Sequence, residues 1–121
     1  MGEILFIQYP RCSTCKKAKA WLDSHGIAYT SRDITEDNPT KEELKAWKEA
    51  SGLPVRRFFN TSGKLYRELN VKKLLDAGMK DDEAYALLAT DGMLVKRPIL
   101  LIDGVPLTPG FKEAEWAERL L

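Results

Sequence analysis

A loop with two cysteines, set between an apolar run and an amphipathic segment, constrains the fold of this chain most strongly. Residues 4–7 are Ile-Leu-Phe-Ile, and the loop at residues 9–15 reads Tyr-Pro-Arg-Cys-Ser-Thr-Cys. The pattern predicts a buried strand over residues 3–8, a tight turn, and a helix over residues 13–24. Cys12 would then lie at the first helical turn, where unpaired backbone N–H groups and the helix dipole favour an anion such as a thiolate.

The two cysteines are expected to have different roles. Three cationic side chains lie within five residues of Cys12, and such a setting lowers a thiol pKa from its free value of about 8.5. We therefore expect Cys12 to be the nucleophile. Cys15 follows one turn later, where it can attack an adduct on Cys12 and close a Cys12–Cys15 disulfide.

The residues between the cysteines are candidate substrate contacts. The backbone N–H groups of Thr14 and Cys15, at the start of the helix, would hold negative charge that develops during a reaction at Cys12. Ser13 and Thr14 are accordingly predicted to contact the substrate.

The cysteine pair has two other interpretations. A structural zinc site needs four ligands, whereas the chain has two cysteines and one histidine. We interpret His25, beside Gly26, as the end of the helix rather than a ligand, and expect no metal. Two ordinary buried thiols are the other alternative. A Cys-x-x-Cys near a βαβ pattern favours redox chemistry.

Length and charge exclude several classes of protein. The 121 residues fit one domain over residues 1–121. Nineteen basic and eighteen acidic residues give no electrostatic case for direct nucleic-acid or membrane binding, and the cations are expected to be scattered over a solvated surface. No apolar run is long enough for a membrane span, and no signal peptide is recognised. We expect a cytoplasmic monomer.

The first third and the middle of the chain differ in pattern. A second strand is expected over residues 28–33, which completes a βαβ unit with a right-handed crossover. Thr40 and Glu43 form a capping box before a helix over residues 41–50. Further helices are expected over residues 71–75 and, capped by Asp81 or Asp82, up to residue 90. Residues 36–95 thus read as a helical insertion.

The last quarter returns to β structure. Residues 99–102 and 105–107 flank Asp103-Gly104, and this dipeptide favours the type I′ turn of a hairpin. Pro106 lacks an N–H donor, so its strand is expected at the edge of the sheet. A final helix over residues 112–120 completes a ββα unit. Together, the units predict an α/β, thioredoxin-like fold: a mixed sheet with helices on both sides.

Four segments resemble one known family. They are the Cys12–Cys15 loop, Leu-Pro-Val-Arg-Arg-Phe-Phe-Asn at 53–60, Lys-Leu-Tyr-Arg-Glu-Leu at 64–69, and Lys-Arg-Pro-Ile at 96–99. Together they are similar to the arsenate reductase (ArsC)/Spx family. The resemblance implies that Pro98 follows a cis peptide bond and lies against the active-site cysteine, although the bond would be trans by default. It also implies that Arg97 points at Cys12, where a guanidinium stabilises a thiolate or an oxyanion.

Departures from the family pattern bear on the substrate. The resemblance implies that arsenate reductases of this type hold the oxyanion with three arginines. In this chain only one of the three has a clear counterpart, Arg97. Asn60 stands where the first arginine would fall, and we include Asn60 and Pro98 among the expected substrate contacts. No arginine occurs between Arg97 and Arg119, so the third is missing, unless Arg56, Arg57 or Arg67 substitutes.

These observations predict a thiol-disulfide oxidoreductase that uses the Cys-x-x-Cys pair. Two alternatives stay open: an arsenate reductase linked to glutathione and glutaredoxin, and an Spx-like redox-sensing regulator that binds RNA polymerase. No bound cofactor is expected. The reductant would be an external thiol such as glutathione, glutaredoxin or thioredoxin. The partner would be a small thiol or oxyanion, or a redox partner protein.

Overall fold

The N-terminal part forms the predicted βαβ unit. The computed structural model describes residues 2–121. Strand β1 (Ile4–Gln8) leads through the cysteine loop into helix α1 (Ser13–Ser24), and the chain returns in β2 (Thr30–Asp33). β1 and β2 pair in parallel, with Leu5 opposite Thr30. His25 is the C-cap of α1, as predicted, and Gly26 follows with a positive φ of 66°.

The C-terminal part forms the predicted ββα unit. Strand β3 (Ile99–Ile102) pairs with β4 (Val105–Pro106), and helix α6 (Glu113–Leu120) follows. Asp103 and Gly104 between the strands both have positive φ, at 50° and 82°, as a type I′ turn requires. The sheet order is β2-β1-β3-β4 with β1 antiparallel to β3, so Pro106 lies on an edge strand as expected. The thioredoxin-like plan with a mixed sheet is confirmed.

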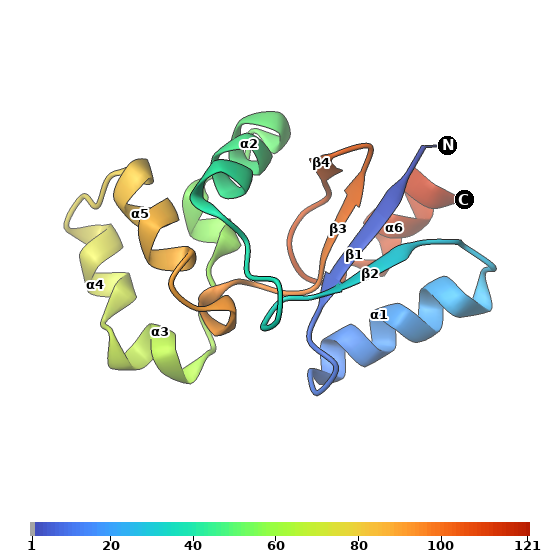
Figure 1. Cartoon of the computed structure of the whole chain (residues 1–121), viewed down its shortest axis with the longest axis horizontal. Coiled ribbons are helices and arrows are strands. Elements are labelled where there is room, and N and C mark those ends of the chain that lie inside the picture. Colours follow the sequence, from blue (N-terminus) through green and yellow to red (C-terminus); the bar gives the residue numbers. More distant parts are fainter. Residues whose placement is uncertain (1) are drawn as a thin grey trace.

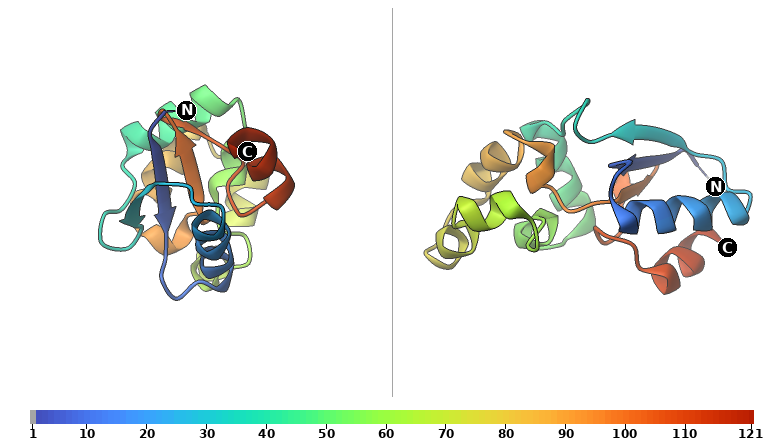
Figure 2. Two further views of the ribbon diagram at one scale, coloured as in Figure 1. Left: turned by 90° about the vertical axis from the view of Figure 1, so that its right-hand side faces the viewer. Right: turned by 90° about the horizontal axis from the view of Figure 1, so that it is seen from below.

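The alternation of side chains along the strands divides the core in two. Successive residues of a strand point to opposite faces, and Ile4, Phe6 and Leu100 pack with α1 and α6. Figure 2 shows these two helices on one face of the sheet. Ile7 and Ile99 belong to the other cluster, which contains the buried residues of the middle segment. Helices therefore cover both faces, as the pattern predicted.

The middle segment is helical and lies to one side of the strands (Figure 1). It contains the helices α2 (Lys41–Ser51), α3 (Lys64–Glu68), α4 (Val71–Asp76) and α5 (Asp81–Leu88), with the 3-10 turns η1 (Val55–Phe58) and η2 (Gly92–Leu94). A bridge between Phe59, just after η1, and Val95, just after η2, joins the middle of this segment to its end. None of the helices in residues 2–121 combines the length and apolar character that a membrane span requires.

Of the two helix N-termini predicted in this segment, one is confirmed and the other is wrong. The capping box of α2 is present, since the Glu43 N–H donates to the Thr40 hydroxyl and the Thr40 N–H donates to the Glu43 carboxylate. The predicted cap of α5 by Asp81 or Asp82 was wrong. Lys80 is the N-cap, and its N–H donates to the Glu83 carboxylate at 3.4 Å. The aspartates lie instead in the first turn, where the helix dipole favours acidic side chains.

Candidate active site

The cysteine loop places one sulfur atom at the start of α1. Cys12 is the N-cap residue, and its extended backbone lets the sulfur accept the N–H of Cys15 at 3.4 Å. The Cys12 N–H donates to the Tyr9 carbonyl at 3.0 Å, which closes the turn after β1. Cys12 is partly exposed and Cys15 is buried, and both are free cysteines. A reagent from solvent therefore meets Cys12 first.

The surroundings give the two sulfur atoms opposite acidities. Burial acts to raise the pKa of Cys12, but the hydrogen bonds from Cys15, the charge of Arg97 and the N–H of Thr14 outweigh it, so this pKa lies below its ordinary value. Burial raises the pKa of Cys15 to about 12, and the neighbouring Cys12 adds to the rise. The arrangement favours a thiolate at Cys12 beside a neutral thiol at Cys15.

Arg97 lies between η2 and β3 and is held from two sides. Its Nη1 donates to the carbonyls of Met93 and Val95 at 3.4 and 3.3 Å. Its guanidinium carbon lies 5.4 Å from the centroid of the Tyr9 ring. The Nε of Arg97 is buried without a protein partner among the described residues. Because its charge lowers the pKa of both cysteines, Arg97 belongs to the same electrostatic site.

The other residues predicted to contact the substrate differ in their position and surroundings. The peptide bond between Arg97 and Pro98 is cis, as the resemblance implied. Ser13 and Thr14 form the exposed first turn of α1. Asn60, in contrast, makes its hydrogen bonds within residues 2–121 to its own turn and to Leu94. Its N–H donates to the Leu94 carbonyl at 2.8 Å, and its side-chain oxygen accepts from the Ser62 hydroxyl.

Two of the arginines that could replace the missing oxyanion ligands have other partners. Arg56 forms an ion pair with Asp76 at 2.8 Å. Arg67 donates to the Ser62 carbonyl at 2.9 Å. Arg97 is thus the arginine whose charge acts on the cysteines. His25 faces the end of α1, where its Nδ1 lies 2.9 Å from the Trp21 carbonyl.

Sequence reasoning gave Tyr9 no role in the site. Tyr9 accepts the Cys12 N–H through its carbonyl, contributes a backbone hydrogen bond that acts to lower the pKa of Cys15, and offers its ring to Arg97. An aromatic residue directly before a Pro-x-Cys sequence is the only local signal. Its contact with Arg97 joins residues that are far apart in the sequence, so only the folded chain reveals it.

Comparison with known proteins assigns the chain to a family. The model of the ArsC family matches residues 7–119. The chain belongs to the ArsC family.

Two curated relatives and one solved structure illustrate the range of similar proteins. The chain is 53% identical to the uncharacterized protein YusI of Bacillus subtilis (strain 168), over 96% of this chain and 97% of that protein. It is 35% identical to the global transcriptional regulator Spx of Staphylococcus saprophyticus, over 88% of this chain and 78% of Spx. The crystal structure of an ArsC family related protein from Bacteroides fragilis superimposes with a TM-score of 0.89. It is 54% identical, and the match covers 96% of both chains.

Proposed function

We propose that this ArsC family member is a thiol-disulfide oxidoreductase with Cys12 as its nucleophile and Cys15 as its resolving thiol. The observation that carries the proposal is the pairing of opposite acidities across a single helical turn. The pKa of Cys12 is lowered while that of Cys15 is raised to about 12, and the Cys15 N–H donates to the Cys12 sulfur. A nucleophilic cysteine reacts as the thiolate, so it needs to be ionised before the substrate arrives. A resolving cysteine is best kept as the neutral thiol until the mixed disulfide has formed.

The proposed reaction has two exchanges. The Cys12 thiolate attacks one sulfur of a substrate disulfide, the S–S bond breaks, and the first substrate thiolate leaves. Cys15 then loses its proton to solvent and attacks the Cys12 sulfur, which releases the second substrate thiolate. The substrate is reduced by two electrons and the protein ends with a Cys12–Cys15 disulfide. An external dithiol, or two molecules of a thiol such as glutathione, restores the reduced pair.

The timing of the second exchange follows from the causes of the Cys15 pKa. Both the charge of Cys12 and its hydrogen bond with Cys15 contribute to the raised value. Both disappear when Cys12 enters a mixed disulfide, because its sulfur is then neutral. Burial, the largest cause of the raised Cys15 pKa, remains, so this pKa falls only in part at the step in which Cys15 reacts.

The remaining residues of the site have supporting roles in the proposal. Arg97 and the N–H groups of Thr14 and Cys15 stabilise negative charge at Cys12. Ser13 is exposed beside Cys12 and is available to contact the substrate, whereas Pro98, after its cis bond, is buried next to Arg97. We propose a cytoplasmic location, where external thiols can reset the pair, and no bound cofactor.

Arsenate reduction is the less favoured activity. Each charge-assisted hydrogen bond to an anion contributes about 1.5–3 kcal/mol. Arg56 and Arg67 have other partners, and Arg57 does not figure among the charges that act on the cysteines. Arg97 alone would then hold the oxyanion, and binding would be weaker by orders of magnitude. Rapid arsenate turnover by the purified protein with glutathione and glutaredoxin would overturn this preference.

A regulatory role is the second candidate, and the 35% identity to Spx favours it. In that role the same cysteine pair would act as a redox toggle, and RNA polymerase would be the partner. The two functions differ in a direct binding experiment. Absence of any polymerase subunit from a pull-down with the reduced and the oxidised protein would leave the enzyme as the surviving candidate.

Single-cysteine variants test the oxidoreductase. We expect Cys12→Ser to abolish exchange with glutathione disulfide. Cys15→Ser should still react at Cys12 but stop at a stable mixed disulfide, visible in the mass spectrum as one added glutathione. The wild-type protein should instead accumulate the Cys12–Cys15 disulfide. Full activity in both variants would refute the assignment of roles.

A further inference from the structure

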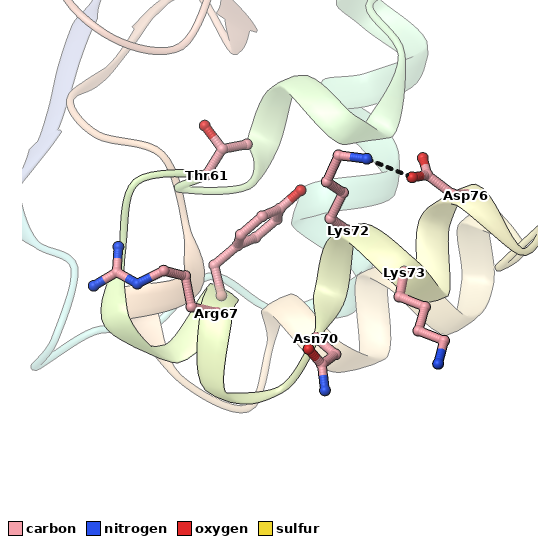
Figure 3. Close-up of a pocket in the computed structure, with 7 residues that line it drawn as sticks. Thr61, Arg67, Asn70, Lys72, Lys73 and Asp76 are labelled. Atoms are coloured by element: carbon pink, nitrogen blue, oxygen red, sulfur yellow. Dashed lines mark hydrogen bonds and ion pairs between the residues drawn. The ribbon is translucent and has the colours of Figure 1, made fainter.

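The largest of the described cavities lies away from the cysteines, in the helical segment. It has a volume of about 560 Å³ and opens between the loop at Thr61 and the helices α3 and α4. Figure 3 shows cationic side chains around it, Arg67 from α3 and Lys72 and Lys73 from α4. The proposed redox reaction uses none of these residues.

Positive charge is concentrated in the segment that contains this cavity. Residues 56–76 include six Lys or Arg residues and two acidic ones, whereas the other hundred residues carry thirteen basic and sixteen acidic residues. These cations are exposed to solvent, as expected, but their density along the chain is higher here than elsewhere. A basic segment in a chain that is otherwise acidic attracts an acidic partner and orients it.

Part of this charge has no compensation within the chain. Asp76 lies 2.7 Å from the Lys72 ammonium and 2.8 Å from the Arg56 guanidinium, so it is shared by two cations. Arg67 and Lys73 have no acidic partner within 4 Å among residues 2–121. Two cations at the rim of the cavity are therefore available to a ligand.

The arrangement of the two available cations favours an extended ligand. Figure 3 shows the Arg67 guanidinium and the Lys73 ammonium on opposite sides of the cavity, with Asn70 between them. A compact anion would reach one of them, whereas an extended chain with spaced carboxylates reaches both. The Tyr66 ring, 7% exposed and packed against Phe59, provides an apolar part of the cavity wall.

We propose that this cavity is the docking site for an extended acidic segment of the protein that exchanges electrons with Cys12. The inference rests on the proposed function for the identity of the partner. Figure 1 shows α3 and the start of α1 at the same, lower edge of the molecule, so a partner docked at the cavity approaches the edge that carries Cys12. The cavity thereby supplies partner recognition to a cysteine loop that is itself small and exposed.

A peptide titration tests the docking site without relying on thiol chemistry. The probe is an eight-residue peptide of alternating glutamate and glycine, added to the isotope-labelled full chain and followed by backbone amide shifts. We expect shifts at residues 61–76, binding that weakens as salt is added, and no comparable binding of the peptide with glutamine in place of glutamate. Arg67→Gln combined with Lys73→Gln should weaken binding about tenfold, the effect of losing two surface charge contacts.

A matched variant and a compact anion complete the experiment. Lys41→Gln combined with Lys45→Gln removes two exposed cations of α2 that also lack an acidic partner in residues 2–121, and should leave binding within about twofold of wild type. Absent shifts, shifts spread over other basic residues, or equal loss in both double variants would overturn the proposal. Equally strong shifts with inorganic phosphate would overturn it in favour of a small-anion site.

The thiol reaction is measured separately on the same proteins. Arg67→Gln with Lys73→Gln should react with glutathione disulfide at the wild-type rate, because neither residue belongs to the cysteine site. If the wild-type protein does not exchange with this disulfide, the proposed oxidoreductase function fails while the peptide result still decides the docking site. If exchange is normal and the peptide does not bind, the docking proposal alone fails.

Discussion

The Arg97 guanidinium carbon lies 5.4 Å from the centroid of the Tyr9 ring, within the range of a cation–π contact. Tyr9 also accepts the Cys12 N–H through its carbonyl at 3.0 Å. One residue thus connects the cation of the site to the loop that carries the nucleophile. Arg97 is further fixed by two carbonyls near η2, so its charge is held in place before any substrate arrives.

The first prediction concerns the ring of Tyr9. Tyr9→Leu removes the π face that steadies Arg97, and we expect the Cys12 pKa to rise and the alkylation rate at pH 7 to fall about two- to fivefold, which corresponds to a cation–π contact of about 0.5–1 kcal/mol. Tyr9→Phe keeps the ring and should react like wild type. The rate of iodoacetamide alkylation as a function of pH checks both. Equal profiles for the leucine and phenylalanine variants would show that the ring does not position Arg97.

The second prediction concerns the charge of Arg97. Its interaction favours the thiolate, so Arg97→Gln should raise the Cys12 pKa and shift the whole reactivity profile to higher pH. The sign follows because the thiolate is the reactive form, and a higher pKa leaves less of it at neutral pH. We expect a loss of about three- to tenfold in alkylation rate at pH 7.

A control for Arg97 comes from the loop itself. Arg11 is exposed and does not figure among the causes of the lowered Cys12 pKa. Arg11→Gln should therefore leave the pH profile in place. A shift as large as that of Arg97→Gln would mean that general positive charge, rather than the fixed position of Arg97, sets the acidity.

The third prediction concerns an ion pair that joins the sheet to the helical segment. Arg32 on β2 donates to both carboxylate oxygens of Glu43 on α2, at 2.8 and 2.9 Å. The hydrogen bonds from Arg32 lower the pKa of Glu43. Glu43→Gln keeps an acceptor for the capping box but removes the charge, and should reduce the free energy of unfolding at pH 7 by about 1 kcal/mol, since the pair is partly solvated.

The pH dependence of that difference has a definite sign. A carboxyl whose pKa is lowered by folding contributes stability above its unfolded pKa and loses it as pH falls through the folded value. Urea unfolding should therefore separate wild type from Glu43→Gln at pH 7 and bring the two curves together in acid. Glu42→Gln, at an exposed position in the same first turn, is the control: it loses the interaction with the helix dipole but no ion pair, and should cost clearly less than Glu43→Gln at pH 7. A difference that persists in acid would contradict a charge effect.

The fourth prediction concerns the close approach of η2 to the end of β2. Gly92 is buried, and a Cβ atom there would overlap the Ile34 carbonyl oxygen and lie 2.8 Å from the Asn38 side-chain oxygen. Gly92→Ala must displace backbone, so we expect a loss of about 1–3 kcal/mol in the free energy of unfolding. Thermal unfolding measures it, and unchanged stability would show that η2 can move freely.

Features that depend on neighbouring residues were predicted from the sequence. The cysteine loop at the start of a helix, the capping box of Thr40 and Glu43, and the hairpin turn at Asp103-Gly104 all occur where expected. Each is decided by backbone angles and hydrogen bonds within a few residues.

Features that depend on distant residues were decided only by the tertiary structure. Helix α3 has no strong local signal, and its Tyr66 is buried in the core of the helical segment. The contact of Arg97 with Tyr9 joins residues from different elements. The side chain of Asn60, in contrast, is bonded to its own turn. The sequence by itself determined a βαβ and ββα chain with a reactive cysteine at a helix start. Only the fold decided which charges surround that cysteine, because electrostatic and packing energies depend on distance in space rather than along the chain.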